Sequence, residues 1–138
     1  MDTDQLLDML QNTELEPADG KVSFEVGVTT VEWTNVYCSV LGRTILVASP
    51  VPFDSPQYPA AGVIMFTFPN SLPALKPVDF GLGEQQVALL FSYGGGIPPL
   101  PGLGPTFTLE IVAPGKIYKG NFSCRNLSLT GGTFDINL

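Results

Sequence analysis

Histidine is absent from the 138-residue chain, so the side chain that most often moves protons near neutral pH is missing. Its absence removes the Ser-His-Asp and Cys-His nucleophile arrangements and the histidine-based metal sites. The sequence also contains no Gly-x-Ser-x-Gly elbow, no phosphate-binding loop and no Asp-x-Asp-x-Asp-Gly calcium loop. Gly81-Leu82-Gly83 begins like a dinucleotide-binding motif, but Gln86 stands where the third glycine should be. We therefore expect no catalytic residues, no metal, no cofactor and no enzymatic activity.

Two carboxylates are the remaining candidates for chemistry, because a pair of acids can hydrolyse a glycosidic bond. Glu32, beside Trp33, and Glu110 form the best available pair, although in strands both are expected to face solvent. Four aromatic residues could instead form a platform on which sugar rings stack: Trp33, Tyr37, Phe53 and Tyr58. The competing interpretation places the chain's single tryptophan in the core.

The two cysteines, Cys38 and Cys124, are too few for a disulfide framework or a zinc site. Both lie in runs that alternate apolar and polar residues, which predicts buried thiols that behave as small hydrophobic residues. A disulfide between strands is the alternative, and it would require Cα atoms within about 7 Å of each other.

Charge is sparse and unevenly distributed along the chain. Charged residues make up 14% of the sequence, against a usual share of about 25%. Six of the 13 acids precede Lys21 with no base among them, so most of the net charge of −7 belongs to the N-terminal segment. The six Lys and Arg are scattered, which argues against binding to nucleic acid. The acidic N-terminus does not resemble a signal peptide and no apolar run could span a membrane, so we expect cytoplasmic synthesis.

The N-terminal segment is predicted to contain a short amphipathic helix over residues 3–11. Thr3 is a suitable N-cap, and Leu6, Leu7 and Leu10 form one apolar stripe that Met9 flanks. About nine residues are too few for a helix that is stable alone in water. The stripe therefore needs a surface, either on its own domain or on another subunit. With a linker over residues 12–20, the pattern divides the chain into an arm, 1–20, and a β-domain, 21–138.

Alternating apolar and polar residues predict strands throughout the rest of the chain. The expected strands cover residues 21–28, 31–40, 44–48, 62–68, 84–93 and three runs of a C-terminal meander within 105–138, with a further short edge strand near 78–80. Pro114-Gly115 and Gly131-Gly132 are the expected turns of the meander. Seven to nine short strands with Pro/Gly turns and no long helix predict a single antiparallel β-sandwich or jelly roll.

Two loops are unusually rich in proline and glycine. The first, residues 49–61, holds four prolines together with Phe53 and Tyr58. The second, residues 94–105, holds five glycines and four prolines, and its only other residues are Ile97, Leu100 and Leu103. Those three side chains either fold back over an open end of the domain or are presented to a partner.

The C-terminal meander carries two Gly-x-Phe segments, Gly120-Asn121-Phe122 and Gly132-Thr133-Phe134, each followed by alternating residues. This pattern resembles the closing hairpin of small bacterial β-sandwich proteins of unknown function. The resemblance covers roughly the last 35 residues of the chain. It implies a β-sandwich fold and no functional residues.

The sequence therefore favours a non-enzymatic structural or interaction protein that assembles with protein partners, as a homo-oligomer or as a subunit of a larger assembly. A decoration, tail or accessory protein of a bacteriophage virion is one such subunit. The expected partner-binding residues are apolar side chains of the arm and of the two loops: Leu6, Leu7, Met9, Leu10, Phe53, Tyr58, Ile97, Leu100 and Leu103. The alternative is a lectin-like module for carbohydrate binding or adhesion that uses its aromatic residues.

Overall fold

The computed structural model describes residues 2–83, 86–95, 97–113 and 116–138, without the side chains of residues 105, 106 and 111–113. One α-helix precedes a chain that is otherwise almost entirely β. The elements are α1 (Thr3–Asn12), β1 (Glu16–Val26), β2 (Thr29–Trp33), β3 (Asn35–Ser39), β4 (Thr44–Ser49), β5 (Val63–Phe68), β6 (Val78–Phe80), β7 (Ala88–Ser92), β8 (Leu100–Pro101), β9 (Gly104–Ala113), β10 (Ile117–Cys124), the 3-10 turn η1 (Arg125–Leu127) and β11 (Leu129–Asn137).

All 11 strands belong to one antiparallel sheet in the order β6-β9-β10-β11-β1-β3-β4-β5-β7-β8, with β2 attached to β1. The long strand β1 joins the two halves of this sheet. Its first residues, Glu16 to Ala18, pair with β3, whereas its later residues pair with β11 on one side and β2 on the other. One bent strand therefore carries the chain from one layer of the molecule to the other.

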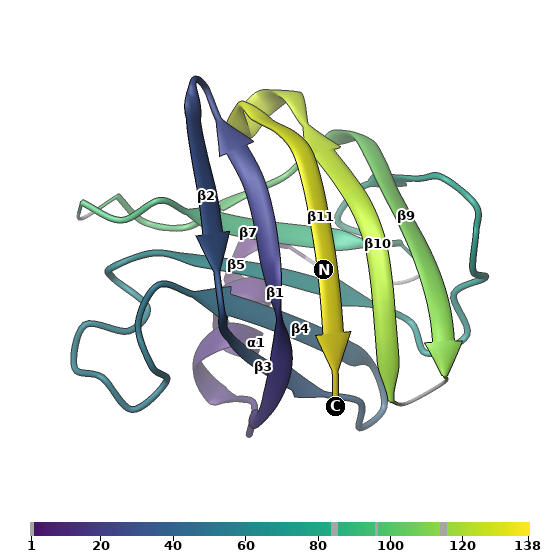
Figure 1. The fold of residues 1–138 in the computed structure, drawn as a ribbon, viewed down its shortest axis with the longest axis horizontal. Coiled ribbons are helices and arrows are strands. Elements are labelled where there is room, and N and C mark those ends of the chain that lie inside the picture. The colour runs from purple at the N-terminus through teal and green to yellow at the C-terminus, as the bar shows by residue number, and fades with distance from the viewer. Residues whose placement is uncertain (1, 84–85, 96, 114–115) are drawn as a thin grey trace.

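The sheet is strongly curled, so its two halves face each other as two layers (Figure 1). The front layer contains β2, β1, β11, β10 and β9, and the back layer contains β3, β4, β5 and β7, whose strands run across those in front. The prediction of an all-β antiparallel domain is confirmed. The predicted sandwich of two separate sheets is replaced by a half-barrel, because β1 is hydrogen-bonded in both layers.

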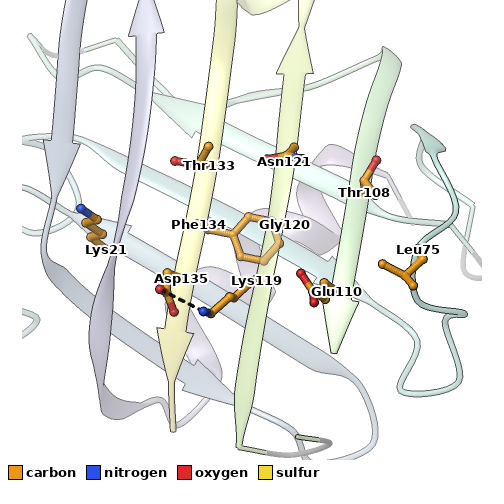
Figure 2. A pocket seen from close by; sticks show the side chains of 10 residues that line it. All are labelled: Lys21, Leu75, Thr108, Glu110, Lys119, Gly120, Asn121, Thr133, Phe134 and Asp135. Carbon is orange, nitrogen blue, oxygen red and sulfur yellow. Dashed lines mark ion pairs between the residues drawn. The ribbon is translucent and has the colours of Figure 1, made fainter. Parts of the chain in front are cut away.

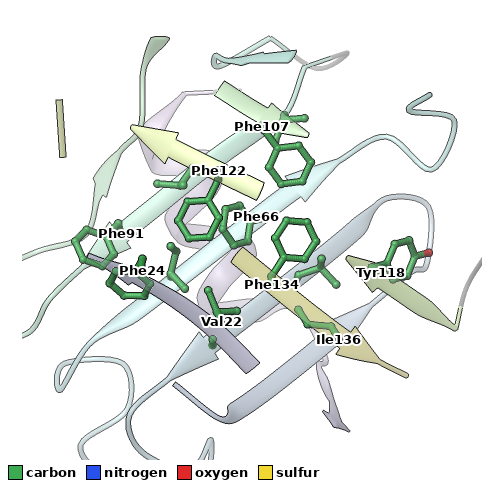
Figure 3. Close-up of a cluster of buried hydrophobic side chains, with 14 of the residues drawn as sticks. Val22, Phe24, Phe66, Phe91, Phe107, Tyr118, Phe122, Phe134 and Ile136 are labelled. Carbon is green, nitrogen blue, oxygen red and sulfur yellow. The ribbon is translucent and has the colours of Figure 1, made fainter. Parts of the chain in front are cut away.

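The inner core between the layers is dominated by phenylalanine (Figure 3). Phe66 of β5 lies with its ring centroid 4.8 Å from that of Phe122 and 5.5 Å from that of Phe134. The Phe107 and Phe134 rings stack at 5.4 Å. Aromatic contacts at such distances add to the free energy gained from burial. These residues come from both layers, so the same cluster holds the curled sheet closed.

A second core lies on the other face of the back layer, where α1 covers the sheet (Figure 1). Leu6 and Leu10 of the helix are 0% and 1% exposed against side chains of β3, β4, β5 and β7. Because both faces of the back layer are covered, every residue of β4, β5 and β7 is buried. This explains why 44–48 and 62–68 read as continuous apolar runs and not as alternating ones.

Several predicted boundaries were wrong. The helix is capped by Asp2 and not by Thr3, since the Asp2 carboxylate accepts a hydrogen bond from the Gln5 amide while the Gln5 side chain accepts one from the Asp2 amide. The predicted linker 12–20 contains the first residues of β1. The predicted strand 31–40 is divided at Thr34, where the chain passes from the front layer to the back.

The predicted meander is confirmed as the antiparallel strands β9, β10 and β11, but one of its turns was misplaced. Gly131-Gly132 lies inside β11, and the chain instead reverses at η1. The Pro114-Gly115 turn lies outside the described residues.

The two Gly-x-Phe segments are explained by the register of β10 and β11. Gly120 is the cross-strand partner of Phe134, and Phe122 is the partner of Gly132. Side chains of directly opposed residues lie on the same face of a sheet. Each phenylalanine ring therefore lies over the glycine opposite, and a side chain at position 120 would overlap the Phe134 ring.

Candidate functional site

The most exposed group of aliphatic side chains predicted to bind a partner lies in the segment 94–104, which we call the aliphatic loop. The side chains of Ile97, Leu100 and Leu103 are 61%, 50% and 49% exposed. Of the two arrangements that the sequence left open, this exposure argues against the one in which the side chains fold back over an open end of the domain. Water contact with large aliphatic side chains is unfavourable by roughly 25 cal/mol per Å² of exposed apolar area.

The backbone of the aliphatic loop is nevertheless anchored to the domain. The Ser92 hydroxyl donates to the Ile97 carbonyl at 2.8 Å, and the Gly102 amide donates to the Leu89 carbonyl at 2.8 Å. Asn126, from the 3-10 turn η1, accepts from the Leu103 amide at 3.0 Å and donates to the Pro101 carbonyl at 3.1 Å. The short strand β8 within the loop also pairs with β7. The aliphatic side chains are therefore held outward on a fixed backbone.

Three of the four candidate platform aromatics lie together. The Phe53 ring centroid is 5.2 Å from that of Tyr37 and 4.9 Å from that of Tyr58, and the Phe53 amide donates to the Tyr37 hydroxyl at 2.6 Å. Phe53 is 39% exposed, Tyr58 is half-buried and Tyr37 is buried. Trp33 belongs to the inner core, where its ring is 5.1 Å from that of Phe24. The cluster therefore exposes the edge of one loop and not a broad aromatic platform.

The Tyr58 hydroxyl is buried and has no hydrogen-bond partner. Burial, followed by the influence of the neighbouring Tyr37, raises the pKa of Tyr58 to about 12. The phenol therefore stays protonated at physiological pH and carries an unused donor.

The apolar stripe of α1 contacts the chain's own domain. Leu6 and Leu10 are covered by the back layer, whereas Leu7 and Met9 are half-buried at the edge of the same cluster. Of the nine predicted partner-binding residues, Leu6 and Leu10 thus have no surface left for a partner in this arrangement.

A polar depression of about 390 Å³ lies on the outer face of the front layer (Figure 2). Thr108, Asn121 and Thr133 form a row across β9, β10 and β11, and a second row carries Glu110, Lys119, Asp135 and Lys21. Two of each charge make this second row neutral. Lys119 Nζ lies 3.8 Å from Asp135 Oδ2, and the other oxygen of Asp135 is buried without a hydrogen-bond partner.

Leu75 forms one side of this depression. It has a left-handed backbone with φ of 65°, its amide donates to the Leu109 carbonyl at 2.6 Å, and its side chain is 70% exposed. This depression carries no distinctive sequence signal, because short runs of Thr, Asn, Lys and Asp on the outer face of strands are also what a solvated surface requires.

The remaining chemical candidates do not come together. Glu32 and Glu110 lie on β2 and β9, four strand steps apart in the front layer, which is about 19 Å at about 4.8 Å per step. Glycosidase carboxylates are about 5–9.5 Å apart.

Cys38 and Cys124 are both buried with free thiols, and burial raises the pKa of each. In the part of the chain that the structure describes, no cluster of three or more potential metal ligands occurs.

Comparisons of the chain with protein-family models, with curated proteins and with solved structures found no match. The resemblance to small bacterial β-sandwich proteins thus stays a hypothesis. No helix among the described residues is both long and apolar enough to cross a membrane.

Proposed function

We propose that this chain is a non-enzymatic subunit of a protein assembly and that the aliphatic loop is its contact with a protein partner. One observation carries the proposal: Ile97, Leu100 and Leu103 are exposed although hydrogen bonds and the pairing of β8 with β7 tie the loop that holds them to the domain. Large apolar side chains that are exposed together on one segment are a common feature of protein interfaces. A subunit of a virus particle is one such assembly.

The fixed backbone favours binding, because side chains that are already oriented lose less conformational entropy when a partner covers them. The low charge of the chain is also consistent with this role, since charged residues are depleted at the centres of interfaces. Phe53 is a further exposed aromatic residue that could contribute to contacts with a partner.

The test is purification of the tagged chain from its source cells, followed by cross-linking and mass spectrometry. A triple variant, Ile97→Ser with Leu100→Ser and Leu103→Ser, is expected to lose the partner that the wild-type chain retains. Purified partner and chain should then bind in titration calorimetry, and the triple variant should bind at least about tenfold more weakly, a loss of about 1.4 kcal/mol.

The matched control is Val28→Ser with Leu41→Ser. These two side chains are 103% and 89% exposed at other turns of the domain. The control should bind the partner as the wild type does. Equal binding by the triple variant, or an equal loss in the control, would contradict the assignment of the interface to the aliphatic loop.

A second candidate function is carbohydrate binding. The polar depression favours it, whereas Trp33 does not, because that side chain lies in the inner core. Its central row presents hydroxyl and amide groups from Thr108, Asn121 and Thr133, which can donate to and accept from sugar hydroxyls. Its charged row is neutral in sum, which suits an uncharged ligand. A glycan array should then show binding that Asn121→Ala removes and Ser123→Ala, on the same strand, retains. An array with no binding by the wild type ends this candidate.

A further inference from the structure

Three strands of the curled sheet are at its edges, and two of them are protected against further pairing. β6 has three residues, and β8 has two, of which one is Pro101. Very short strands and proline are devices by which natural sheets avoid adding strands from other molecules. β2, the third, is the outermost strand of the front layer and pairs with β1 alone within the described part of the chain (Figure 1).

β2 lacks these protective features. It has five residues, Thr-Thr-Val-Glu-Trp, with no proline, no lysine and no register shift along its pairing with β1. Four of the five are β-branched or aromatic, which are the residue types that favour strands. Thr29, Thr30 and Glu32 are exposed. This edge is therefore suited to main-chain pairing with another strand.

The turn before β2 determines which backbone groups face the open edge. Gly27 has φ of 59° and Val28 does not have a positive φ, the pattern of a type II′ turn in a two-residue hairpin. Such a turn is closed by hydrogen bonding between Val26 and Thr29, its flanking pair. Hydrogen-bonded and non-hydrogen-bonded pairs alternate along an antiparallel ladder. Thr29, Val31 and Trp33 consequently bond to β1, and the amides and carbonyls of Thr30 and Glu32 face outward.

We propose that β2 pairs antiparallel with β2 of a second copy of this chain, about a two-fold axis at Val31. This register places Thr30 of each copy opposite Glu32 of the other, and all four outward-facing residues then exchange main-chain hydrogen bonds. No two like charges are opposed, and the Glu32 carboxylate is already balanced by Lys21 Nζ at 3.2 Å. The pairing rests on the proposed function, because it supplies the assembly subunit with one of its contacts, on a surface separate from the aliphatic loop.

Sedimentation velocity of the purified chain, from micromolar to millimolar concentration, tests the pairing. The wild type and Thr30→Ala, which keeps the amide, should form dimers. Thr30→Pro removes the outward amide, a substitution that an edge strand tolerates, and should remain monomeric over the same range. A wild type that stays monomeric at millimolar concentration, or a folded Thr30→Pro variant that dimerises equally well, overturns the proposal.

A charge pair at position 30 tests the register and does not depend on the proline variant folding. Thr30→Lys would face Glu32 of the second copy and Thr30→Glu would oppose it with a like charge, twice in each dimer. The dimer dissociation constants of these variants should differ about two- to thirtyfold in favour of lysine, as expected from the range of cross-strand pair energies. Weaker dimerisation by the lysine variant overturns the assigned register.

The triple serine variant of the aliphatic loop separates this inference from the proposed function. It should dimerise as the wild type does while losing the protein partner, whereas Thr30→Pro should keep the partner. A loop variant that loses the dimer would show that the copies meet through the aliphatic loop, and it would overturn the pairing through β2.

Discussion

The residues that give the front layer its shape are two glycines that lie opposite phenylalanines. Gly120 and Gly132 leave the space that Phe134 and Phe122 occupy, and the two rings then reach Phe66 of the back layer. An aromatic residue that covers a cross-strand glycine is a known stabilising device in β-sheets. The Gly-x-Phe spacing is therefore accounted for by packing alone, without any ligand.

Substitution of Gly120 tests this packing. Gly120→Ala should destabilise the fold by about 1–3 kcal/mol, because the added methyl group would overlap the Phe134 ring and the Thr108 carbonyl. Urea denaturation measures the change. The neighbouring outward-facing substitution Asn121→Ala should change stability by less than about 0.5 kcal/mol. Equal effects of the two substitutions would contradict the assignment.

Tyr58 and Tyr37 provide a matched pair of hydroxyl deletions. Tyr58→Phe removes a buried hydroxyl without a partner, so stability at pH 7 should be unchanged or higher. Tyr37→Phe removes the acceptor of the Phe53 amide and should cost about 1 kcal/mol. Chemical denaturation at pH 7 distinguishes the two, and a larger loss in Tyr58→Phe would contradict the structure.

The same tyrosine predicts a pH dependence. Its pKa is raised from 10.0 to about 12, so the folded state holds the phenol proton more tightly than the unfolded state does. The stabilisation is complete below about pH 10 and is lost as pH rises from about 10 to about 12. Stability should therefore fall more steeply over this window in the wild type than in Tyr58→Phe. Parallel curves would contradict the burial of this group.

The helix α1 packs against the back layer of the sheet through Leu6 and Leu10. Leu6 and Leu10 occupy the second core, so Leu6→Ala or Leu10→Ala should each cost about 2–5 kcal/mol. Leu7→Ala, at the half-buried edge, should cost less. Thermal unfolding of the three variants measures this order. Small, equal effects would show that the helix is docked loosely.

The sequence predicted the helix and most strands, including the three strands of the meander, because periodicity reports which side of an element is covered. The sequence could not show that the apolar stripe at Leu6 and Leu10 would pack on the back layer. The continuous apolar run of β4 does not reveal which element covers that strand. It also misplaced a turn at Gly131-Gly132, where glycine is required by an opposing ring and not by a change of direction.

The candidate site was predicted in part. The composition of residues 94–105 indicated that three aliphatic side chains would be hard to bury, and the described side chains of Ile97, Leu100 and Leu103 are exposed. The anchor residue Asn126 could not be found in this way, because a single asparagine about 23 residues away carries no periodic signal. Whether β2 has an open edge depends on which strands pair with it. Local sequence patterns do not show which strands pair.

In the molecule as a whole, one continuous sheet curls around a phenylalanine core and a helix covers its back, and we propose two exposed surfaces for association. The aliphatic loop offers apolar side chains and β2 offers main-chain groups. These surfaces differ in chemistry, so one chain could hold a copy of itself and another protein at once. Such an arrangement is what a subunit of a larger assembly requires.

The aliphatic loop is fixed in place by its backbone hydrogen bonds while its side chains face outward. Amide hydrogen exchange of the isolated chain, followed residue by residue by NMR, tests it most directly at Gly102 and Leu103, whose amides bond to Leu89 and Asn126. We predict that both amides exchange far more slowly than in an unstructured peptide. Asn126→Ala should speed up exchange of the Leu103 amide and leave exchange of the Gly102 amide unchanged. Exchange of both amides at the unstructured rate in the wild-type chain would contradict a fixed loop.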